Sequence, residues 1–375
     1  MKSPTILLLA GEASGDNWGA NLAADIKRRL PDSDLLGVGG PLMEAQGVVL
    51  VEDIAKLSIM GVGGLIGKLP FFFFLRRKLL RILVEKEVDL VVAIDFAGFN
   101  MSIIRDAHRK SIKVLYYVAP KVWAWGFNRT KKLIRSADHI AVIFPFEEEI
   151  WKKAGGRVTF VGHPVLDHPS EFVSDRKQFC EKWNLDPERP ILALFPGSRP
   201  QEISRHLDLF VETGHRIRET YPEVQIVIGR SLSIDRKRLQ GKNIAVVDEG
   251  RSLLTHSRAG LLKSGTATLE ACLAGTPFVT VYKTDLLTWF MAQKILKIEH
   301  ISIPNLLGNQ KQIPEILQGD ATPEHLAEEL IPLLETRNPK YRETLSYFES
   351  IAECLGEAGV AQRVGAIIES LLGDK

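Results

Sequence analysis

Short apolar runs alternate with longer amphipathic stretches from one end of this chain to the other, and this alternation limits the folds that it can adopt. Continuous apolar strands separated by helices are typical of parallel sheets that are buried on both faces. The sequence therefore predicts an α/β protein. We expect its strands at residues 5–10, 35–38, 90–94, 113–118, 139–143, 158–161, 191–195, 225–228, 244–247, 260–262 and 278–282.

The chain is too long for one comfortable hydrophobic core, and its 375 residues indicate two domains. Residues 162–170 contain two His-Pro pairs and precede a charged stretch, so we place the boundary there. Because each side carries its own β-α series, we predict two doubly wound, Rossmann-like domains facing a cleft, at residues 1–165 and 166–340. A helical segment at 341–375 is expected to pack back on the first domain. Ligands of such sheets bind at the carboxyl ends of the strands.

The charge and the cysteine content exclude several classes of function. The formal net charge is +2, without the basic excess of a nucleic-acid-binding protein. The three cysteines are far apart, which argues against a disulfide framework and favours a reducing compartment. The first apolar run is shorter than a signal-peptide core, and no run reaches the ~18 apolar residues of a spanning helix. We therefore expect a protein that is soluble or attached to a membrane surface.

A small-residue turn in the second domain has the character of a phosphate site. Ser264, Gly265 and Thr266 follow an apolar run and precede a helix. Unpaired backbone N–H groups and the helix dipole both favour a phosphate or diphosphate at such a place. Glu270 falls on the first turns of the same helix, where its carboxylate could accept hydrogen bonds from the vicinal hydroxyls of a sugar. An ordinary N-capped core helix is the alternative.

A second loop in this domain strengthens the prediction. Ser198 and Arg199 follow the strand at 191–195 and offer a hydroxyl and a guanidinium, which grips a diphosphate bidentately. Together the two loops predict a two-sided diphosphate clamp.

The first domain carries its own candidate residues at the ends of strands. Asp95 ends a uniformly apolar strand, where a carboxylate could act as a general base on an attacking hydroxyl. A turn or helix cap is the alternative for this residue. The loop after the first strand matches neither GxGxxG nor GxxxxGK[ST], yet its glycines allow a ligand close to the backbone. An ordinary βα turn is the competing interpretation. The candidate residues of this loop are Gly11, Glu12, Ser14 and Gly15.

Aromatic residues mark two further places. Trp123 and Trp125 follow the strand at 113–118 and suit a sugar ring or an acyl chain, although core aromatics are the competing explanation. The segment 63–83 predicts a basic, aromatic-rich helix with more apolar surface than a half-buried helix needs. It favours a lipid interface or an acyl-chain groove, and burial between domains or subunits is the alternative. The residues assigned to this contact are Phe71, Phe72, Phe73, Phe74, Arg76 and Arg77.

Metal chemistry finds little support in the sequence. There is no HExxH motif, no paired carboxylates of the DxD type at a strand end and no cluster of His and Cys. We expect catalysis without a metal or another cofactor.

Distinct motifs occur along nearly the whole chain. They are GEASGD (11–16), MG (60–61), DFAGFN (95–100), VAPKVWAW (118–125), FPFE (144–147), GHP (162–164), PGSR (196–199), SGTATLE (264–270) and SIPNLL (302–307). Taken together, these motifs resemble the lipid-A-disaccharide synthase family, which consists of bacterial glycosyltransferases with the two-domain GT-B fold. The family usually carries proline at the position of Ala97, which puts the rigidity of the Asp95 loop in question.

The resemblance implies a hexosyltransferase that joins UDP-2,3-diacylglucosamine to 2,3-diacylglucosamine 1-phosphate with inversion. Asp95 would be the base, and the loops at 198–199 and 264–266 would hold the departing diphosphate. Glu270 would bind the ribose, and Asn305 would face the donor. The resemblance also implies a cytoplasmic protein attached peripherally to the inner membrane of a Gram-negative bacterium, with no nucleic-acid partner and with homodimerisation left open.

Other functions fit parts of the same pattern. A related GT-B enzyme could take a different acceptor, and a UDP-sugar 2-epimerase or hydrolase could share the fold. A non-catalytic protein that binds a nucleotide sugar or a lipid is the alternative from another class.

Overall fold

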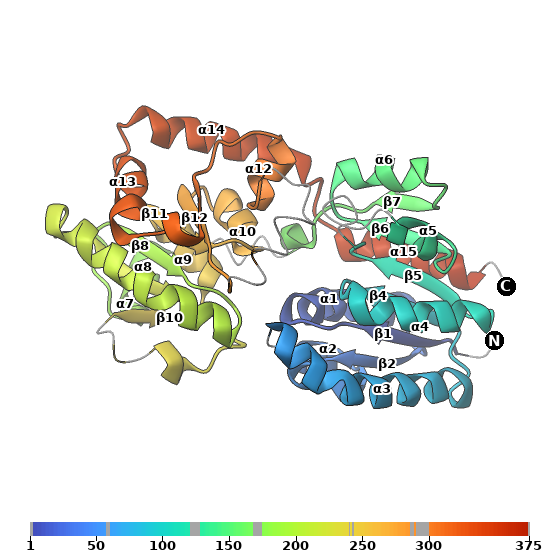
Figure 1. The fold of residues 1–375 in the computed structure, drawn as a ribbon. Helices are drawn as coiled ribbons and strands as arrows, with labels where there is room; N and C mark the ends of the chain where they lie inside the picture. The colour runs from blue at the N-terminus through green and yellow to red at the C-terminus, as the bar shows by residue number, and fades with distance from the viewer. Residues whose placement is uncertain are drawn as a thin grey trace. The chain divides into compact units, whose positions relative to one another are not determined.

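A computed structural model describes residues 3–57, 61–120, 128–167, 175–239, 241, 244–285, 289 and 300–373. The chain divides into two compact units (Figure 1). The first unit comprises Met1–Asp167 and Leu355–Lys375, and the second comprises His168–Cys354.

The first unit is built on a seven-stranded sheet of order β3-β2-β1-β4-β5-β6-β7, in which all pairs are parallel. The strand order reverses between β1 and β4, because β1 has β2 on one side and β4 on the other. The strands are β1 (Thr5–Leu9), β2 (Asp34–Gly39), β3 (Val49–Asp53), β4 (Leu90–Ile94), β5 (Lys113–Tyr117), β6 (His139–Val142) and β7 (Val158–Phe160).

Helices cover both faces of this sheet. A buried apolar cluster joins Leu79 and Ile103, on two of the helices, to strand residues such as Val91 and Tyr116. On the other side, α15 packs beside α1 although the two helices are far apart in sequence (Figure 1). The helices are α1 (Ala13–Arg29), α2 (Pro41–Ala45), α3 (Gly61–Glu85), α4 (Ala97–Arg109), α5 (Asn128–Ile134), α6 (Pro145–Lys153) and α15 (Val360–Gly373), with 3-10 turns η1 (Ile54–Lys56) and η2 (Pro164–Asp167).

The second unit repeats the plan with a six-stranded parallel sheet of order β10-β9-β8-β11-β12-β13. Here the order reverses between β8 and β11, which pair directly. The strands are β8 (Ile191–Phe195), β9 (Gln225–Gly229), β10 (Ala245–Val247), β11 (Ala259–Lys263), β12 (Phe278–Tyr282) and β13 (Glu315–Leu317).

The largest buried cluster of this unit packs helices α8 and α13 against the sheet, with Phe210 and Leu330 among its members. The helices are α7 (Arg176–Trp183), α8 (Pro200–Thr220), α9 (Gly250–His256), α10 (Ala267–Leu273), α12 (Ile303–Gly308), α13 (Pro323–Leu334) and α14 (Pro339–Cys354), with 3-10 turns η4 (Arg236–Leu239) and η5 (Gln318–Asp320).

All eleven predicted strands are present, so the α/β assignment with parallel sheets is confirmed. Two edge strands, β3 and β13, were not among them. The structure also shows that the helical segment predicted at 341–375 is not one continuous helix. Two glycines with left-handed backbone, Gly356 (φ +83°) and Gly359 (φ +91°), separate α14 from α15. Because α14 belongs to the second unit, the chain returns to the first unit after Cys354 and not at the predicted position 341.

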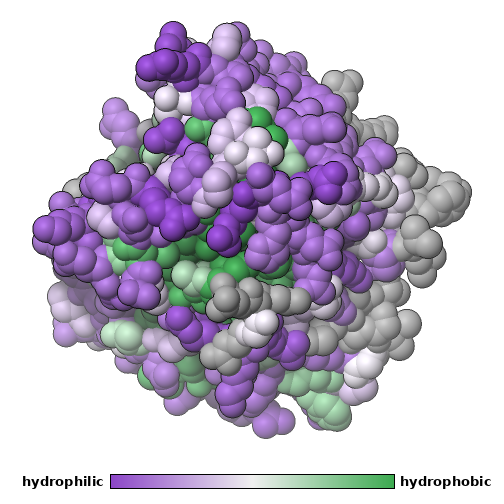
Figure 2. Space-filling model, turned by 90° about the vertical axis from the view of Figure 1, so that its left-hand side faces the viewer, coloured by the Kyte–Doolittle hydropathy of each residue, from purple (hydrophilic) through white to green (hydrophobic). Residues whose placement is uncertain are grey.

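Hydrophilic residues predominate on the molecular surface that Figure 2 presents, with smaller hydrophobic areas between them. Among the helices that the structure describes, none combines the length and the apolar character required to cross a bilayer.

Candidate functional site

In the first unit, the loops that follow β1 and β4 meet at the carboxyl edge of the sheet, where the strand order reverses. Gly11 follows β1, and a Cβ placed on it would lie 2.1 Å from Cγ of Phe96, which follows β4. The ring of Phe96 therefore packs directly against the glycine backbone. Open α/β sheets bind ligands at this kind of crevice.

The turn that carries Asp95 has an unusual backbone conformation. Asp95 (φ +49°) and Phe96 (φ +48°) are consecutive left-handed residues, and Val118 (φ +60°) has the same conformation at the end of neighbouring β5. Each such non-glycine residue costs on the order of 1–3 kcal/mol, and such strain concentrates at functional sites. Half-buried Asp95 is thus held in a geometry that an unconstrained chain would avoid.

Two buried side chains fasten this turn. The amide of Asn100 donates to the carbonyl of Asp95 at 2.9 Å and to that of Leu9, at the end of β1, at 3.1 Å. The hydroxyl of Tyr116 donates to the same Asp95 carbonyl at 2.8 Å. These bonds connect the ends of β1, β4 and β5 through the Asn100 amide and the Asp95 carbonyl, and they offset the strain of the turn.

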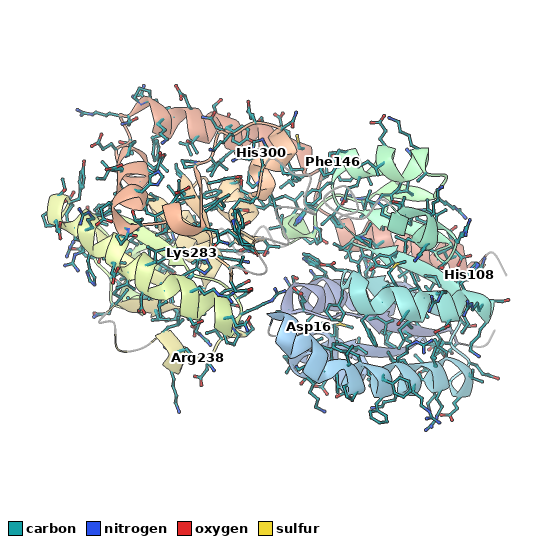
Figure 3. All side chains as sticks on the ribbon, viewed as in Figure 1. Asp16, His108, Phe146, Arg238, Lys283 and His300 are labelled. Carbon is teal, nitrogen blue, oxygen red and sulfur yellow. The ribbon has the colours of Figure 1, made fainter. Side chains whose placement is uncertain are left out.

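The loop after β1 begins α1 and presents residues of different exposure. Glu12 is exposed, Ser14 is half-buried, and Gly11 and Gly15 are buried. Asp16, labelled in Figure 3, is buried and accepts hydrogen bonds from the backbone N–H groups of Gly40 (2.7 Å), Leu42 and Met43 (both 3.1 Å). Its carboxylate therefore caps α2.

In the second unit, the two loops predicted to bind a diphosphate follow β8 and β11, the strands that pair where the order reverses. Ser198 and Arg199 are exposed, and Arg199 immediately precedes α8. Gly197 adopts φ +133°, and a Cβ on it would lie 2.4 Å from Cβ of Glu202. The structure thus brings both loops to one edge of one sheet.

Glu202, in the first turn of α8, connects these loops. Its Oε2 accepts from the Ser198 N–H at 2.9 Å, and its Oε1 lies 2.7 Å from the ammonium of Lys263, the last residue of β11. Burial raises the pKa of Glu202, but Lys263, the Ser198 N–H and the charge of Arg199 outweigh burial, so its pKa lies below the usual value. Glu202 is therefore held as a carboxylate.

One turn along α8, the ring of fully buried His206 makes two fixed hydrogen bonds. Nδ1 lies 2.7 Å from the carbonyl of Glu202, and Nε2 accepts from the backbone N–H of Lys283 at 3.0 Å (Lys283 is labelled in Figure 3). This pattern requires the neutral Nδ1–H tautomer. Burial lowers the pKa of His206 to about 4, and the charges of Lys263 and Lys283 act in the same direction, although the bond to Glu202 opposes them.

The turn after β11 is tied to a third segment. The Ser264 hydroxyl donates to the carbonyl of Ile301 at 2.7 Å. Thr266 precedes α10 without a side-chain capping bond, so its hydroxyl does not occupy the helix start. Glu270 Oε1 accepts from Nε of Arg251, on α9, at 3.1 Å. This ion pair fixes one carboxylate oxygen of Glu270, the residue predicted to bind the ribose.

Asn305 is fully buried, and its amide group bonds within the protein. It donates to the carbonyl of Ile313 (2.8 Å) and to Glu315 Oε1 (2.9 Å), and it accepts from the Ile313 N–H (2.9 Å). Glu315 also accepts from the backbone and hydroxyl of Ser302. This placement gives Asn305 a structural role and does not support the prediction that it faces the donor.

The four phenylalanines at 71–74 divide between two faces of α3. Phe72 packs against the rings of Phe96 and Phe99, with centroids 6.4 and 5.5 Å away, so one face adjoins the Asp95 turn. Phe73 and Phe74 are 59% and 65% exposed. Arg76 pairs with Asp106 of α4, and Arg77 is exposed.

Comparisons with known proteins decide the family. The profile of the family described as lipid-A-disaccharide synthetase matches residues 6–359. The lipid-A-disaccharide synthase of Coxiella burnetii (strain CbuG_Q212) is 36% identical over 377 residues, covering 99% of this chain and 100% of the relative. The enzyme of the same name from Geobacter metallireducens is 35% identical, covering 99% and 98%. This chain belongs to the lipid-A-disaccharide synthase family.

Solved structures show that this family member shares its fold with an epimerase and a glycosyltransferase. A putative UDP-N-acetylglucosamine 2-epimerase from Listeria monocytogenes has a TM-score of 0.66 at 15% identity, covering 100% of this chain and 98% of its own. The calicheamicin glycosyltransferase CalG4 has a TM-score of 0.63 at 16% identity, covering 100% and 99%. At these identities the likeness concerns the fold alone, and it confirms the two-sheet, GT-B-like architecture.

Trp123 and Trp125, which the sequence predicts as site residues, lie outside the described residues.

Several other residues of this family member were not anticipated from its sequence. The residues that the structure adds are Asn100, Tyr116, Glu202, His206, Arg251 and Lys263. Asn100 stood within the DFAGFN motif, and Glu202 had a signal in its place three residues after Arg199, on the first helical turn.

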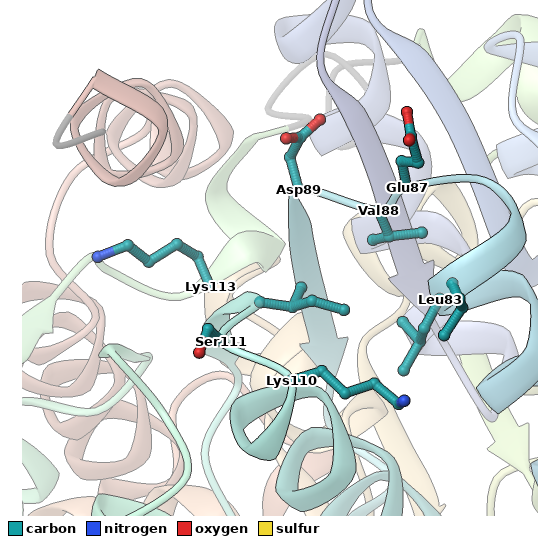
Figure 4. A pocket seen from close by; sticks show the side chains of 9 residues that line it. Leu83, Glu87, Val88, Asp89, Lys110, Ser111 and Lys113 are labelled. Atoms are coloured by element: carbon teal, nitrogen blue, oxygen red, sulfur yellow. The ribbon is translucent and has the colours of Figure 1, made fainter.

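Two negative findings complete the description of the site. In the described ranges, no three His, Cys, Asp or Glu side chains gather as a metal ion would require. A pocket of about 440 Å³ lies at the amino ends of β4 and β5, and Figure 4 shows Asp89, Lys110 and Lys113 among its lining residues. This pocket is at the sheet edge opposite to Asp95.

Proposed function

We propose that this chain is an inverting glycosyltransferase that joins UDP-2,3-diacylglucosamine to 2,3-diacylglucosamine 1-phosphate. The products are the β-1,6-linked tetraacyl disaccharide 1-phosphate and UDP. The observation that carries the proposal is the strained, fastened turn of Asp95 at the carboxyl edge of the first sheet, in a chain whose family match spans residues 6–359.

In the proposed reaction, Asp95 removes the proton from the 6-hydroxyl of the acceptor. The hydroxyl oxygen then forms a bond to the anomeric carbon of the donor while the bond from that carbon to the diphosphate breaks. A single displacement inverts an α-linked donor to a β product. The left-handed turn and the bonds from Asn100 and Tyr116 support this role, because they fix the backbone of the base before substrate binds.

The second unit supplies the proposed donor site. Arg199 and the turn formed by Ser264, Gly265 and Thr266 hold the departing diphosphate and stabilise its developing charge. Glu270, oriented by Arg251, accepts hydrogen bonds from the ribose hydroxyls. The adjacency of β8 and β11 supports this assignment, because it brings two loops from separate parts of the sequence to one edge of the sheet.

Acylated substrates also account for the exposed face of α3. Leu69, Phe73 and Phe74 are 56%, 59% and 65% exposed, and the basic residues Arg77 and Lys78 follow on the same helix. Exposed aromatics beside basic side chains are typical of a helix lying in a lipid interface. We therefore place the protein peripherally at the cytoplasmic surface of the inner membrane.

A turnover assay tests the function. Purified protein is incubated in detergent and EDTA with UDP-2,3-diacylglucosamine, with and without the acylated glucosamine 1-phosphate. Disaccharide formed only with both substrates supports the transferase and its independence of added metal. Release of UDP without acceptor would indicate a hydrolase or an epimerase instead.

The base is tested by Asp95→Asn. We expect kcat to fall by about 10²–10⁴-fold, the usual contribution of general base catalysis, with a smaller change in KM. Asp34→Asn is the control, because Asp34 is exposed at the amino end of β2, and it should leave turnover unchanged. Full turnover by Asp95→Asn would remove this residue from the mechanism.

A further inference from the structure

A largely buried ion pair lies between the two loops assigned to the donor diphosphate. Glu202 and Lys263 have side chains only 14% and 17% exposed, and their charged atoms are 2.7 Å apart. We infer that Glu202 and Lys263 are a charge-compensated positioning pair, in which Glu202 sets the conformation of the Ser198 loop and Lys263 cancels the Glu202 charge beside the bound diphosphate. The inference rests on the proposed function.

The positioning part follows from how many elements Glu202 connects. Its carboxylate takes the Ser198 N–H and the Lys263 ammonium, so it joins the loop after β8 to the end of β11. Its backbone carbonyl accepts from His206, whose other nitrogen accepts from Lys283 after β12. Three adjacent strand ends are therefore connected through Glu202 and His206.

The close packing of Gly197 against Glu202 adds a steric constraint. A Cβ at Gly197 would lie 2.4 Å from Cβ of Glu202, and the glycine adopts φ +133°. The chain can thus turn over the Glu202 side chain and deliver Arg199 to the start of α8. A substitution at Glu202 therefore changes the side chain against which the Gly197 backbone packs.

The claim that Lys263 compensates the charge of Glu202 follows from the negative charge of the ligand. A diphosphate held by Arg199 and the 264–266 turn would bring negative charge near the Glu202 carboxylate, where burial limits screening by water. The charged groups around Glu202 are Lys263 on β11 and Arg199 at the start of α8. Around the adjacent ring of Tyr282 lie Arg205 and Asp285, which pair at 3.5 Å. Lys263 is the cation in direct contact, so its removal would leave Glu202 to repel the ligand.

Binding of UDP to three variants separates this role from a merely structural one. Lys263→Met should weaken UDP binding about tenfold, equivalent to about 1.4 kcal/mol. Glu202→Gln keeps an acceptor for the Ser198 N–H and leaves the Lys263 charge uncompensated, so it should bind UDP at least as tightly as the wild-type protein. The double variant, which removes both charges, should recover most of the lost affinity, because the repulsion disappears with the carboxylate.

The pH dependence supplies a second readout. Without Lys263, burial is opposed by fewer charges, so the pKa of Glu202 should rise. As the pH falls through that raised pKa, Glu202 becomes neutral and Lys263→Met should approach the affinity of the wild-type protein. The UDP affinity of the wild-type protein should show no such change between pH 5 and 8, because its Glu202 pKa lies below the usual value. The effect is measured as the difference in UDP affinity between the two proteins at each pH.

Lys340→Met is the matched control. Lys340 of α14 pairs with Glu329 of α13 at 2.6 Å, in the same unit but away from the strand ends, and its loss should leave UDP affinity unchanged. Lys263→Arg keeps the charge and should bind UDP like wild type. If Lys263→Met does not fold, the comparison of Lys263→Arg with the double variant still tests the inference.

Two results would overturn the inference alone. One is wild-type UDP affinity in Lys263→Met at every pH. The other is a double variant that remains as weak as Lys263→Met, or more than tenfold weaker than Lys263→Arg, because Lys263 would then be a direct diphosphate ligand. A wild-type protein that binds no UDP would instead reject the proposed function, and the inference with it.

Discussion

At the scale of single residues, the Asp95 turn shows how a strained backbone is maintained. Asp95 and Phe96 both lie in the left-handed region, and Ala97 then begins α4 at the first helical position. Proline, the residue that the resemblance leads us to expect there, is favoured at the first position of a helix. In this chain Asn100 and Tyr116 hold the turn from inside the protein. The rigidity questioned because of Ala97 is therefore supplied by buried hydrogen bonds.

The contact between Gly11 and Phe96 gives a residue-scale prediction. Gly11→Ala should lower the free energy of unfolding by about 1–3 kcal/mol, because the new methyl group overlaps the Phe96 ring. It should also lower kcat, because Phe96 belongs to the Asp95 turn. Chemical denaturation and steady-state turnover measure both effects. Gly98→Ala is the control, since nothing lies within 4 Å of its added Cβ, and an unchanged Gly11→Ala protein would contradict the contact.

The sequence identified the strand ends that carry candidate residues, because apolar runs followed by Gly, Ser or Asp mark those ends. It did not identify Asn100, Tyr116 or Glu202 as supports. Their partners lie on different strands, and which strands are neighbours depends on the sheet order, which no local pattern encodes. Asn305 shows the converse, since the amide group of a polar residue in a motif can be bonded within the protein.

At the scale of elements, α3 combines a buried face and an exposed aromatic face in one helix. Leu75, Leu79 and Leu83 recur every four residues and are buried against the sheet. Phe73 and Phe74 lie on the exposed side. The excess of apolar residues that the sequence showed thus comes from an ordinary core face plus an exposed aromatic pair.

The exposed pair yields a prediction for membrane binding. Phe73→Ser with Phe74→Ser should reduce binding to vesicles containing anionic lipid by about tenfold, with the free energy of unfolding within about 0.5 kcal/mol of wild type. Co-sedimentation with vesicles measures the binding. Val84→Ser, on the same helix and 57% exposed, is the control and should bind normally. Equal binding by all three proteins would reject α3 as the membrane contact.

Helix α8 carries a pH-dependent contribution to stability through His206. Its pKa of about 4 in the folded protein lies below the ordinary value of 6.5, so the unfolded chain takes up the proton more readily between these values. The stabilisation is complete above pH 6.5 and is lost as the pH falls toward 4. His206→Asn should therefore show a shallower loss of stability over this range, measured by denaturation at several pH values. A slope equal to that of wild type would contradict the assignment.

The two edge strands that the sequence did not predict also have a physical explanation. β3 ends in Glu52 and Asp53, and β13 begins with Glu315, so neither shows a continuous apolar run. An edge strand is paired on one side only and tolerates such residues, whereas the central strands are buried on both faces.

At the scale of the whole molecule, the chain leaves the first unit after Asp167 and returns after Cys354. Asp167 connects the two passages within the first unit. Its carboxylate accepts from the N–H groups of Gly359 (2.9 Å), Val360 (2.8 Å) and Ala361 (2.9 Å), and so caps α15. Arg363 donates to the carbonyl of Val161 at 2.8 Å. The last helix is thus fastened to the residues that precede the departure.

This arrangement predicts that the units respond separately to different changes. Asp167→Ala removes the cap of α15 and should destabilise the first unit by about 0.5–2 kcal/mol. Asp175→Ala removes the cap of α7, where Asp175 accepts from the Gln178 N–H at 2.9 Å, and should destabilise only the second unit. UDP at 100 times its dissociation constant should stabilise the second unit alone by about 2.7 kcal/mol, because the proposed donor loops lie there.

Calorimetry with and without UDP checks this prediction through two unfolding transitions. The Asp167→Ala protein should lose stability in the transition that UDP does not shift, and the Asp175→Ala protein in the one that UDP raises. If both variants and UDP shift a single common transition, the two units unfold as one cooperative body. The folding of the first sheet, with its Asp95 turn, would then depend on the nucleotide bound in the second.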